Sequence, residues 1–442
     1  MKKRRDIGVT RRDLLTMLAA VAVVPRGAYA RPVAGAGPGR RPTKFLQIFV
    51  SGGLDSLFLV DPKSRDEVKP RIAPVYTAQQ LVESNGMRLA PNCRPLEPYL
   101  SRVSVINGIL SGTVGHATGA VQTLQLRRNI RSSSDATIAT LVGQALEPES
   151  PIHAFCLGRA ESLWRPTAGR VVYDEFPSYE LLKRFTSVVN DTHDDLGEHV
   201  IQQVEGLYRD ARTREAATPV RALLQRLKGK VVPPPAVFDS SSIVFSPNLR
   251  DPSISDAAIA AFRAKGDRTL MESFQWALFL LKNNIAPSVW MSSGSYFNWD
   301  THQQNNGRQD VNTAHLMLGL RWFLDQLAAS PGTGGRTLLD EVGIVISSEI
   351  GRFPYLNAQE GKDHFPQVSA ILIGPGLRAG QFGQTDAELI GLPVNLRTGR
   401  PGGSSDTILT LDDVGRTVLE WVGARAPRES GYDGRVMDFC FA

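Results

Sequence analysis

Acidic and histidine side chains gather in three short clusters in the last third of the chain. They are Asp300-Thr301-His302, Ser348-Glu349-Ile350-Gly351-Arg352 and Lys362-Asp363-His364. The chain has seven histidines, and two of them lie here beside carboxylates. Asp, Glu and His are ligands that proteins use for divalent metals such as Zn, Mn, Mg and Ca. The clusters therefore predict a metal-assisted site.

Spacing within the clusters indicates which side chains can reach one ion. Asp300 and His302 are two residues apart, so on an extended chain both point the same way. Adjacent side chains diverge, so of Asp363 and His364 one can bind a metal while the other orients a histidine ligand. Glu349 lies just past an apolar run, where it either binds a ligand or pairs with a nearby arginine.

Two further loops add candidates. Asp55 follows Gly52-Gly53, a pair that lets backbone approach a ligand closely, although a simple β-turn has the same pattern. His116 and Thr118 lie in a loop of small residues that can present a nucleophile or a metal ligand, and the alternative is a tight, solvated loop.

Buried strands must position these residues. Short apolar runs predict strands at residues 45–50, 103–108, 152–157, 288–291, 342–347 and 369–373. Helices are predicted over 135–146 with Asp135 as N-cap, 268–282, 311–327, and 411–422 with Thr410 as N-cap. This alternation predicts an α/β fold with a mainly parallel sheet covered by helices on both faces. Ligands of such sheets bind at the carboxyl ends of the strands, where the clusters are expected.

Residues 177–265 depart from this alternation. Amphipathic stretches there precede Pro233-Pro234-Pro235, so we expect a helical insertion in a large α/β domain that spans residues 44–442. A second domain is the alternative. A Gly/Pro-rich linker, residues 31–43, precedes the domain.

Residues 1–30 have the pattern of an export signal. Arg11-Arg12 forms a twin-arginine motif, and an apolar run and Ala28-Tyr29-Ala30 follow it in the order of a cleaved signal peptide. This predicts export by the twin-arginine translocase, which carries folded proteins, to the periplasm or the cell exterior. The apolar run is too short to cross a bilayer, and no membrane span is expected in the mature protein.

Charge gives no support for nucleic-acid binding. Residues 1–30 hold seven Lys/Arg and two Asp/Glu, a net of +5 out of +6 for the whole chain, which leaves +1 for the rest. The remainder has no basic stripe interleaved with aromatic residues, so no nucleic-acid partner is expected.

The three cysteines allow one disulfide with a spare thiol, or three buried thiols.

The order of the motifs resembles that of the family known as domain of unknown function 1501. The matching segments are Ser51-Gly52-Gly53-Leu54-Asp55, Asp300-Thr301-His302, Ser348-Glu349-Ile350-Gly351-Arg352, Gly361-Lys362-Asp363-His364 and the glycine-rich residues 374–380. That family is placed in the alkaline phosphatase and sulfatase superfamily. The resemblance implies an alkaline-phosphatase-like three-layer sandwich and hydrolysis of phosphate or sulfate esters, of small molecules or polymers.

The resemblance also implies a metal centre, and the chain departs from the pattern in two places. The implied centre is formed by Asp55, Asp300, His302, Glu349 and His364. Ile350 stands where well-studied members have a histidine ligand, and His116 stands at the position of the sulfatase cysteine. Thr118, or His116 itself, would then be the nucleophile or proton donor. We therefore expect an exported metal-dependent ester hydrolase, with an exported non-catalytic binding or assembly protein as the alternative.

Overall fold

The computed structural model describes the sheet and the helices that pack on it. The described residues are 21–22, 31–32, 41–72, 76–130, 135–150, 152–157, 171–174, 225–226, 228–230, 270–293, 298–425 and 432–441. Most of the predicted export signal, the linker before residue 41 and the predicted insertion lie outside these residues. No helix in the described part of the chain is long and apolar enough to cross a membrane.

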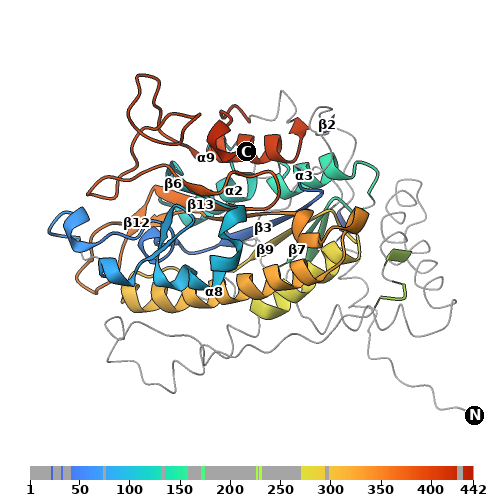
Figure 1. Ribbon diagram of the computed structural model, residues 1–442, viewed down its shortest axis with the longest axis horizontal. Helices are drawn as coiled ribbons and strands as arrows, with labels where there is room; N and C mark the ends of the chain where they lie inside the picture. The colour runs from blue at the N-terminus through green and yellow to red at the C-terminus, as the bar shows by residue number, and fades with distance from the viewer. Residues whose placement is uncertain are drawn as a thin grey trace, which may run out of the picture.

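A nine-stranded sheet forms the centre of the described chain (Figure 1). In spatial order its strands are β1 (Val21–Ala22), β8 (Val171–Asp174), β7 (Ala154–Leu157), β9 (Ser288–Ser292), β3 (Lys44–Val50), β10 (Val342–Ser348), β13 (Gln367–Ile373), β6 (Val103–Leu110) and β14 (Gly380–Phe382). Neighbours from β8 to β10 pair in parallel, and β14 is parallel to β6. The predicted mainly parallel sheet is confirmed.

Strand β13 runs against its neighbours, which the alternating pattern did not predict. It pairs antiparallel with both β10 and β6. A parallel return requires a crossover, usually a helix. Residues 349–366, which connect β10 to β13, instead contain turns and the hairpin of β11 (Gly351–Arg352) and β12 (His364–Phe365). The chain therefore turns back along the sheet without crossing it.

Helices cover both faces of the sheet (Figure 1). One face carries α2 (His116–Gln125), α3 (Ile138–Leu146) and α9 (Leu411–Trp421). The other carries α8 (Asn305–Ala329), the helix of residues 270–282 and the 3-10 segment η4 (Pro91–Arg102). The molecule is thus a three-layer α/β/α sandwich, as expected.

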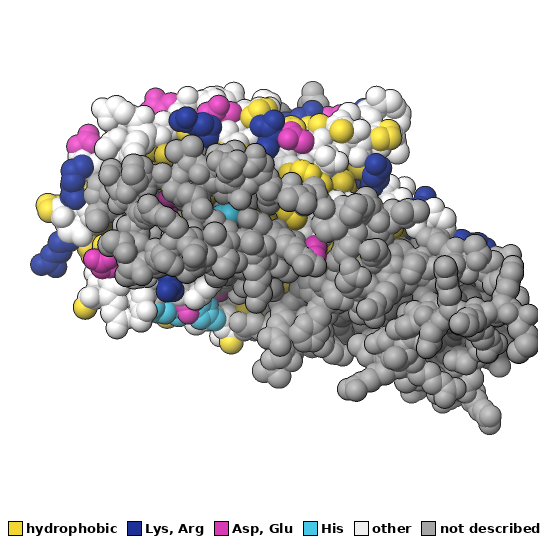
Figure 2. Space-filling model, turned by 90° about the horizontal axis from the view of Figure 1, so that it is seen from below, with side chains coloured by type: hydrophobic (Ala, Val, Ile, Leu, Met, Phe, Trp, Pro, Cys, Tyr) yellow, Lys and Arg dark blue, Asp and Glu magenta, His cyan; other side chains and the backbone are white. Residues whose placement is uncertain are grey.

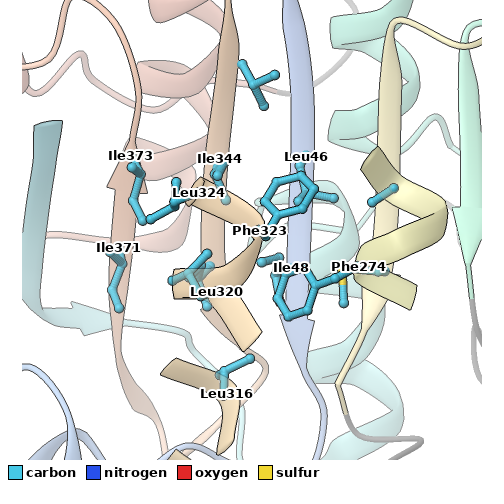
Figure 3. Close-up of a cluster of buried hydrophobic side chains, with 14 of the residues drawn as sticks. Leu46, Ile48, Phe274, Leu316, Leu320, Phe323, Leu324, Ile344, Ile371 and Ile373 are labelled. Atoms are coloured by element: carbon cyan, nitrogen blue, oxygen red, sulfur yellow. The ribbon is translucent and has the colours of Figure 1, made fainter. Parts of the chain in front are cut away.

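Side chains that alternate along the strands fill the two layers of core. On β3, Phe45 packs in the cluster that includes α3 and α9, whereas Leu46 and Ile48 pack in the cluster that includes α8. Figure 3 shows this second layer, where strand residues such as Ile344 and Ile373 face Leu320 and other residues of α8. Strands covered on both faces are apolar on both faces, which is why they read as continuous apolar runs.

Short elements complete the described chain. The paired strands are β4 (Val82–Ser84) with β5 (Met87–Leu89), and β2 (Arg31–Pro32) with β15 (Ala424–Arg425). The remaining 3-10 helices are η1 (Ser56–Phe58), η2 (Arg65–Glu67), η3 (Ala78–Gln80), η7 (Thr333–Gly335), η8 (Leu338–Asp340) and η10 (Asp438–Cys440). All three cysteines are buried and free.

The helix caps differ in how well the sequence predicted them. Thr410 caps α9 in a capping box with Asp413, as expected. Asp135 does not cap α3, so that prediction was wrong. The cap is Thr137, whose hydroxyl accepts the amide of Thr140, and Asp135 instead forms a 2.5 Å ion pair with Arg127.

Strand directions bring the candidate residues to one edge of the sheet. The parallel strands β3 and β10 end there, followed by Asp55 and Glu349 respectively. Since β6 has the same direction as β10, the loop before α2 also starts at this edge. The reversed strand β13 begins at the same edge, so the hairpin before it carries Asp363 and His364 there.

Candidate metal centre

Three histidines meet around one carboxylate at this edge. The Nε2 atoms of His302 and His364 are 2.9 Å apart. They lie 3.2 and 3.3 Å from Oδ1 of Asp300. On the other side of the same carboxylate, Nε2 of His116 is 3.4 Å from Oδ2. Ligand atoms of His116, Asp300 and His364 all lie within 4.8 Å of one another, an arrangement that can hold a metal ion.

The second nitrogen of each of these rings faces a group that can only accept a hydrogen bond. The three pairs are His116 Nδ1 with Glu349 Oε1 at 2.9 Å, His302 Nδ1 with Asp363 Oδ1 at 3.1 Å, and His364 Nδ1 with the carbonyl oxygen of Val114 at 2.6 Å. Carboxylates and carbonyls do not donate, so each Nδ1 carries the proton that is donated. In the neutral ring the remaining nitrogen, Nε2, then has a free lone pair, and all three Nε2 atoms lie within 3.4 Å of an oxygen of the Asp300 carboxylate.

Lone pairs and a carboxylate in such proximity favour a cation. Two unprotonated Nε2 atoms at 2.9 Å repel each other unless a proton or a metal ion lies between them. Nε2 of His116 is buried and has no hydrogen-bond partner among the described residues. Around a tetrahedral ion with bonds of 2.0–2.1 Å, ligand atoms are about 3.3 Å apart. The distances to the Asp300 oxygens, 3.2–3.4 Å, are close to this value, and the 2.9 Å between His302 and His364 is shorter. His116, Asp300 and His364 therefore fit a divalent metal, and His302 lies beside them.

Arg352 fixes the position of the Asp300 carboxylate. Its side chain is fully buried, and its guanidinium donates to Oδ1 of Asp300 at 2.7 Å. Burial alone would raise the pKa of Asp300, but the hydrogen bond and charge of Arg352, with the nearby His116 and His302, hold it below its ordinary value. The carboxylate is therefore kept ionised and oriented, as a metal ligand must be.

The same guanidinium explains the glycine pair after β3. Arg352 donates to the carbonyl oxygens of Gly52, Gly53 and Lys362. A Cβ on Gly53 would lie 2.7 Å from Nε of Arg352, and a Cβ on Gly52 would lie 2.7 Å from the backbone nitrogen of Asp300. The glycines thus allow a close approach, as the sequence indicated, but the approaching groups come from the protein itself.

We expect Gly53→Ala to destabilise the fold more than the same change at Gly86. Both glycines have positive φ, +99° and +72°, so each alanine pays backbone strain of roughly 1–2 kcal/mol. The alanine at position 86 meets nothing within 4 Å, whereas the one at 53 meets Arg352, and such overpacking adds about 1–3 kcal/mol. Urea unfolding of both variants measures the difference. Equal losses would show that the contact with Arg352 is easily relieved.

Glu349 accepts a hydrogen bond from His116, whereas one expectation was that it pairs with Arg352. It is 1% exposed, and its Oε1 accepts both Nδ1–H of His116 and the amide of Gly52, the latter at 2.6 Å. The hydrogen bond to Glu349 raises the pKa of His116, against the effect of burial. A more basic imidazole is a better metal ligand, and carboxylates in this outer position commonly have that effect.

Removing the outer carboxylates should weaken metal binding unequally. Glu349→Gln places an amide that can also donate beside Nδ1 of His116, so the ring loses its fixed orientation, with an expected loss of roughly 10–100-fold in metal affinity. Asp363→Asn makes the same change beside His302, but Asp363 is 66% exposed and water can replace it, so we expect a smaller loss. Competition titration with a chelating dye measures both affinities. An equal loss in the two variants would contradict the outer role of Glu349.

Asp55 lies outside the group formed by Asp300 and the histidines. Its Oδ2 forms a 2.7 Å ion pair with Nζ of Lys362 and accepts the Asn305 amide at 2.9 Å. Its Oδ1 accepts the amide of Leu57. Of the predicted metal ligands, the structure therefore brings Asp300, His302 and His364 together, with Glu349 and Asp363 behind the rings, while Asp55 binds a lysine.

The predicted catalytic residues open the helix beside the centre. His116 is the first residue of α2, and its Nε2 belongs to the metal-binding group. Thr118 lies in the first turn of the same helix and is exposed. Side chains of Asp300 and His302 are 39% and 44% exposed, so solutes can reach the centre. On the face shown in Figure 2, histidine side chains lie beside acidic ones at the surface.

Three contributors to the site were not predicted from the sequence. Arg352 was expected only as an alternative partner of Glu349, and neither Lys362 nor the carbonyl oxygen of Val114 was given a role. A buried arginine or lysine shows no distinctive pattern in a single sequence. The signal that was available is Gly52-Gly53, because a glycine pair after a buried strand indicates that another group approaches the backbone there.

One comparison with known proteins gives a family match. Residues 282–391 match the family model described as "Protein of unknown function (DUF1501)". No curated protein matches the sequence.

Similar solved structures are distant in sequence. A protein of the alkaline phosphatase superfamily from Vibrio parahaemolyticus is 12% identical, with 98% of this chain and 80% of that chain covered and a TM-score of 0.38. A putative sulfatase from Bacteroides thetaiotaomicron is 9% identical, with 90% and 74% covered and a TM-score of 0.39. The C-terminal periplasmic domain of EcEptC from Escherichia coli, in complex with Zn, is 10% identical, with 93% and 88% covered and a TM-score of 0.37.

Likenesses this distant assign no role to any residue of this chain. The family match is more specific, because it spans the elements that bear Asp300, His302, Glu349, Asp363 and His364. Residues 282–391 are therefore similar to the DUF1501 family, and they include most of the candidate metal centre.

Proposed function

We propose that the chain is a metal-dependent hydrolase of a phosphate or sulfate ester that acts after export by the twin-arginine route. The observation that supports it best is the convergence of three imidazole Nε2 atoms on Asp300. A divalent ion bound there, which can be Zn, Mn, Mg or Ca, would polarise an ester oxygen and acidify a water. The exposed edges of Asp300 and His302 would let a substrate reach it.

The first turn of α2 supports an anionic substrate. This helix starts at His116 and has no side-chain cap at its N-terminus. Amides and the helix dipole at such an end favour a negatively charged group, such as a phosphate or sulfate. The substrate anion would therefore lie between the start of α2 and the ring nitrogens of the centre.

The protein's own groups would divide the work as follows. The Nδ1 proton of His116 is donated to Glu349 and its Nε2 faces Asp300, so we assign this residue to metal binding. Thr118 is exposed in the same turn of α2, and its hydroxyl is the proposed nucleophile or proton donor. Arg352 would keep Asp300 ionised throughout turnover, because the guanidinium remains charged at any working pH.

A second candidate function has its own support. If the three histidines and Asp300 all bound one ion, they would supply the four ligands of a closed site, which is typical of structural metal sites. In that case the chain would be an exported binding or assembly protein whose metal stabilises the edge of the sheet. The two functions differ in whether a ligand position is open to substrate.

Thr118→Val is expected to reduce ester hydrolysis by about 100-fold or more while metal content stays unchanged. The experiment loads the protein with each of the four ions, confirms metal by mass spectrometry, and screens arylphosphates and arylsulfates. Thr398→Val, which alters an exposed hydroxyl in another loop, is the matched control. Hydrolysis that survives Thr118→Val would remove this residue from the mechanism. Stoichiometric metal without hydrolysis of any ester would favour the binding protein.

A further inference from the structure

The ion pair between Asp55 and Lys362 is enclosed within the protein beside the candidate centre. The two side chains are 3% and 2% exposed, and Nζ of Lys362 lies 2.7 Å from Oδ2 of Asp55. The Asn305 amide donates to the same oxygen at 2.9 Å, and the amide of Leu57 donates to Oδ1. The carboxylate is thus neutralised and hydrogen-bonded on both oxygens by the protein itself.

Glu349 is the other carboxylate that follows a parallel strand, and both of its oxygens also have hydrogen-bond partners within the protein. Its Oε1 accepts from Gly52 and His116, and its Oε2 lies 3.2 Å from the hydroxyl of Ser348. Ile350, which follows it, is apolar and fully buried. Positions 349 and 350 therefore offer an ion neither a free carboxylate nor a ring nitrogen.

A second ion at Asp55 would have to displace the ammonium of Lys362. Burying a charge without a partner costs far more than breaking an exposed ion pair, so the displaced ammonium would need another anion or water. Backbone contacts also hold the lysine, since its amide donates to Thr301 and its carbonyl accepts from Arg352. Lys362 cannot move away without disturbing the segment that bears His364.

We infer that the centre binds a single ion, and that the ammonium of Lys362 takes the place of a second cation at Asp55. This rests on the proposed function for the first ion, held by Asp300 and the three histidines. The inference departs from the ligand set that the family resemblance implied, which included Asp55 and Glu349. It follows that a substrate anion would meet one metal ion, and that Lys362 contributes its charge from within the protein.

The pair also links two parts of the site. Asp55 belongs to the loop after β3, whereas Lys362 is two residues before the ligand His364. The ion pair therefore fixes the hairpin that carries the ligand against the edge of the sheet. A neutral pair of the same shape, made by Asp55→Asn with Lys362→Met, would preserve this packing and remove both charges.

The test is a metal titration of the full chain with Zn²⁺ and with Co²⁺, followed by mass spectrometry of metal content after gel filtration. We expect the wild type to bind a single ion, and the double variant Asp55→Asn/Lys362→Met to bind a single ion with unchanged affinity. The Co²⁺ absorption spectrum, which reports the ligands directly, should be the same in both. Circular dichroism confirms that the double variant is folded.

Other outcomes would separate this inference from the proposed function. A second ion bound by the wild type would overturn the inference while leaving the first centre intact. Loss of the ion, or a changed Co²⁺ spectrum, in the folded double variant would show that Asp55 is a ligand, with the same consequence. A wild-type chain that takes up no ion would remove the centre and the inference together, whereas a single ion without ester hydrolysis would leave the inference standing.

Discussion

Asp300→Asn is expected to abolish metal binding while leaving the fold intact. Asp300 is the carboxylate around which the three Nε2 atoms converge, and the amide that replaces it carries no charge to balance the ion. The loss should exceed the roughly 10–100-fold that outer partners of ligands typically cost. Metal content after gel filtration and a competition titration measure the effect.

The side chain that holds Asp300 explains why the fold should survive. Arg352 retains three backbone carbonyl acceptors when the carboxylate is replaced, so its buried charge is not left without partners. Asp325→Asn, which removes an exposed carboxylate of α8, is the matched control and should keep full metal content. Full metal content in Asp300→Asn would contradict the proposed centre.

Breaking the buried ion pair should have the largest effect on stability. Asp55→Asn leaves the Lys362 ammonium enclosed without its counter-charge, and such a change typically lowers the free energy of unfolding by about 3–5 kcal/mol. Lys362→Met leaves the carboxylate unpaired and should cost a similar amount. The double variant Asp55→Asn/Lys362→Met should recover most of the loss, because it leaves no buried charge without a counter-charge.

A double-mutant cycle of urea unfolding measures the coupling between the two side chains. The exposed pair of Arg321 and Asp325 on α8 serves as the comparison, since exposed pairs contribute about 0–1 kcal/mol. If the losses at Asp55 and Lys362 simply add in the double variant, the two charges do not stabilise each other, and the buried pair would not be the fixed element described above.

Strand and helix periodicity predicted the architecture well, because apolar runs report burial directly. The runs before Gly52 and Glu349 are β3 and β10, and the helix after Thr410 begins where its cap predicted. The reversed direction of β13 could not be predicted in the same way. Direction depends on whether the connecting chain crosses the sheet, and residues 349–366 form a hairpin instead of a crossover helix.

The members of the site were predicted better than their partners. Asp300, His302 and His364 were expected near one another, and Asp363 and His364 contact opposite nitrogens of the His302 ring. Partners such as Lys362 for Asp55, or Glu349 for His116, are separated by hundreds of residues. Such pairs arise from the packing of loops at the strand edge, which local patterns do not encode.

The outer acceptors of the three histidines come from separate parts of the chain: the loop before α2, the turn after β10 and the hairpin before β13. These acceptors come together only once the sheet has formed, so the ring nitrogens are positioned to bind an ion only in the folded chain. An ion that binds the folded chain stabilises it by an amount that grows with the logarithm of its free concentration. Under the proposed twin-arginine export, in which the chain folds before it crosses the membrane, the ion would be acquired in the cytoplasm. The metal supply inside the cell, rather than that of the compartment where the protein works, would then decide which ion it carries.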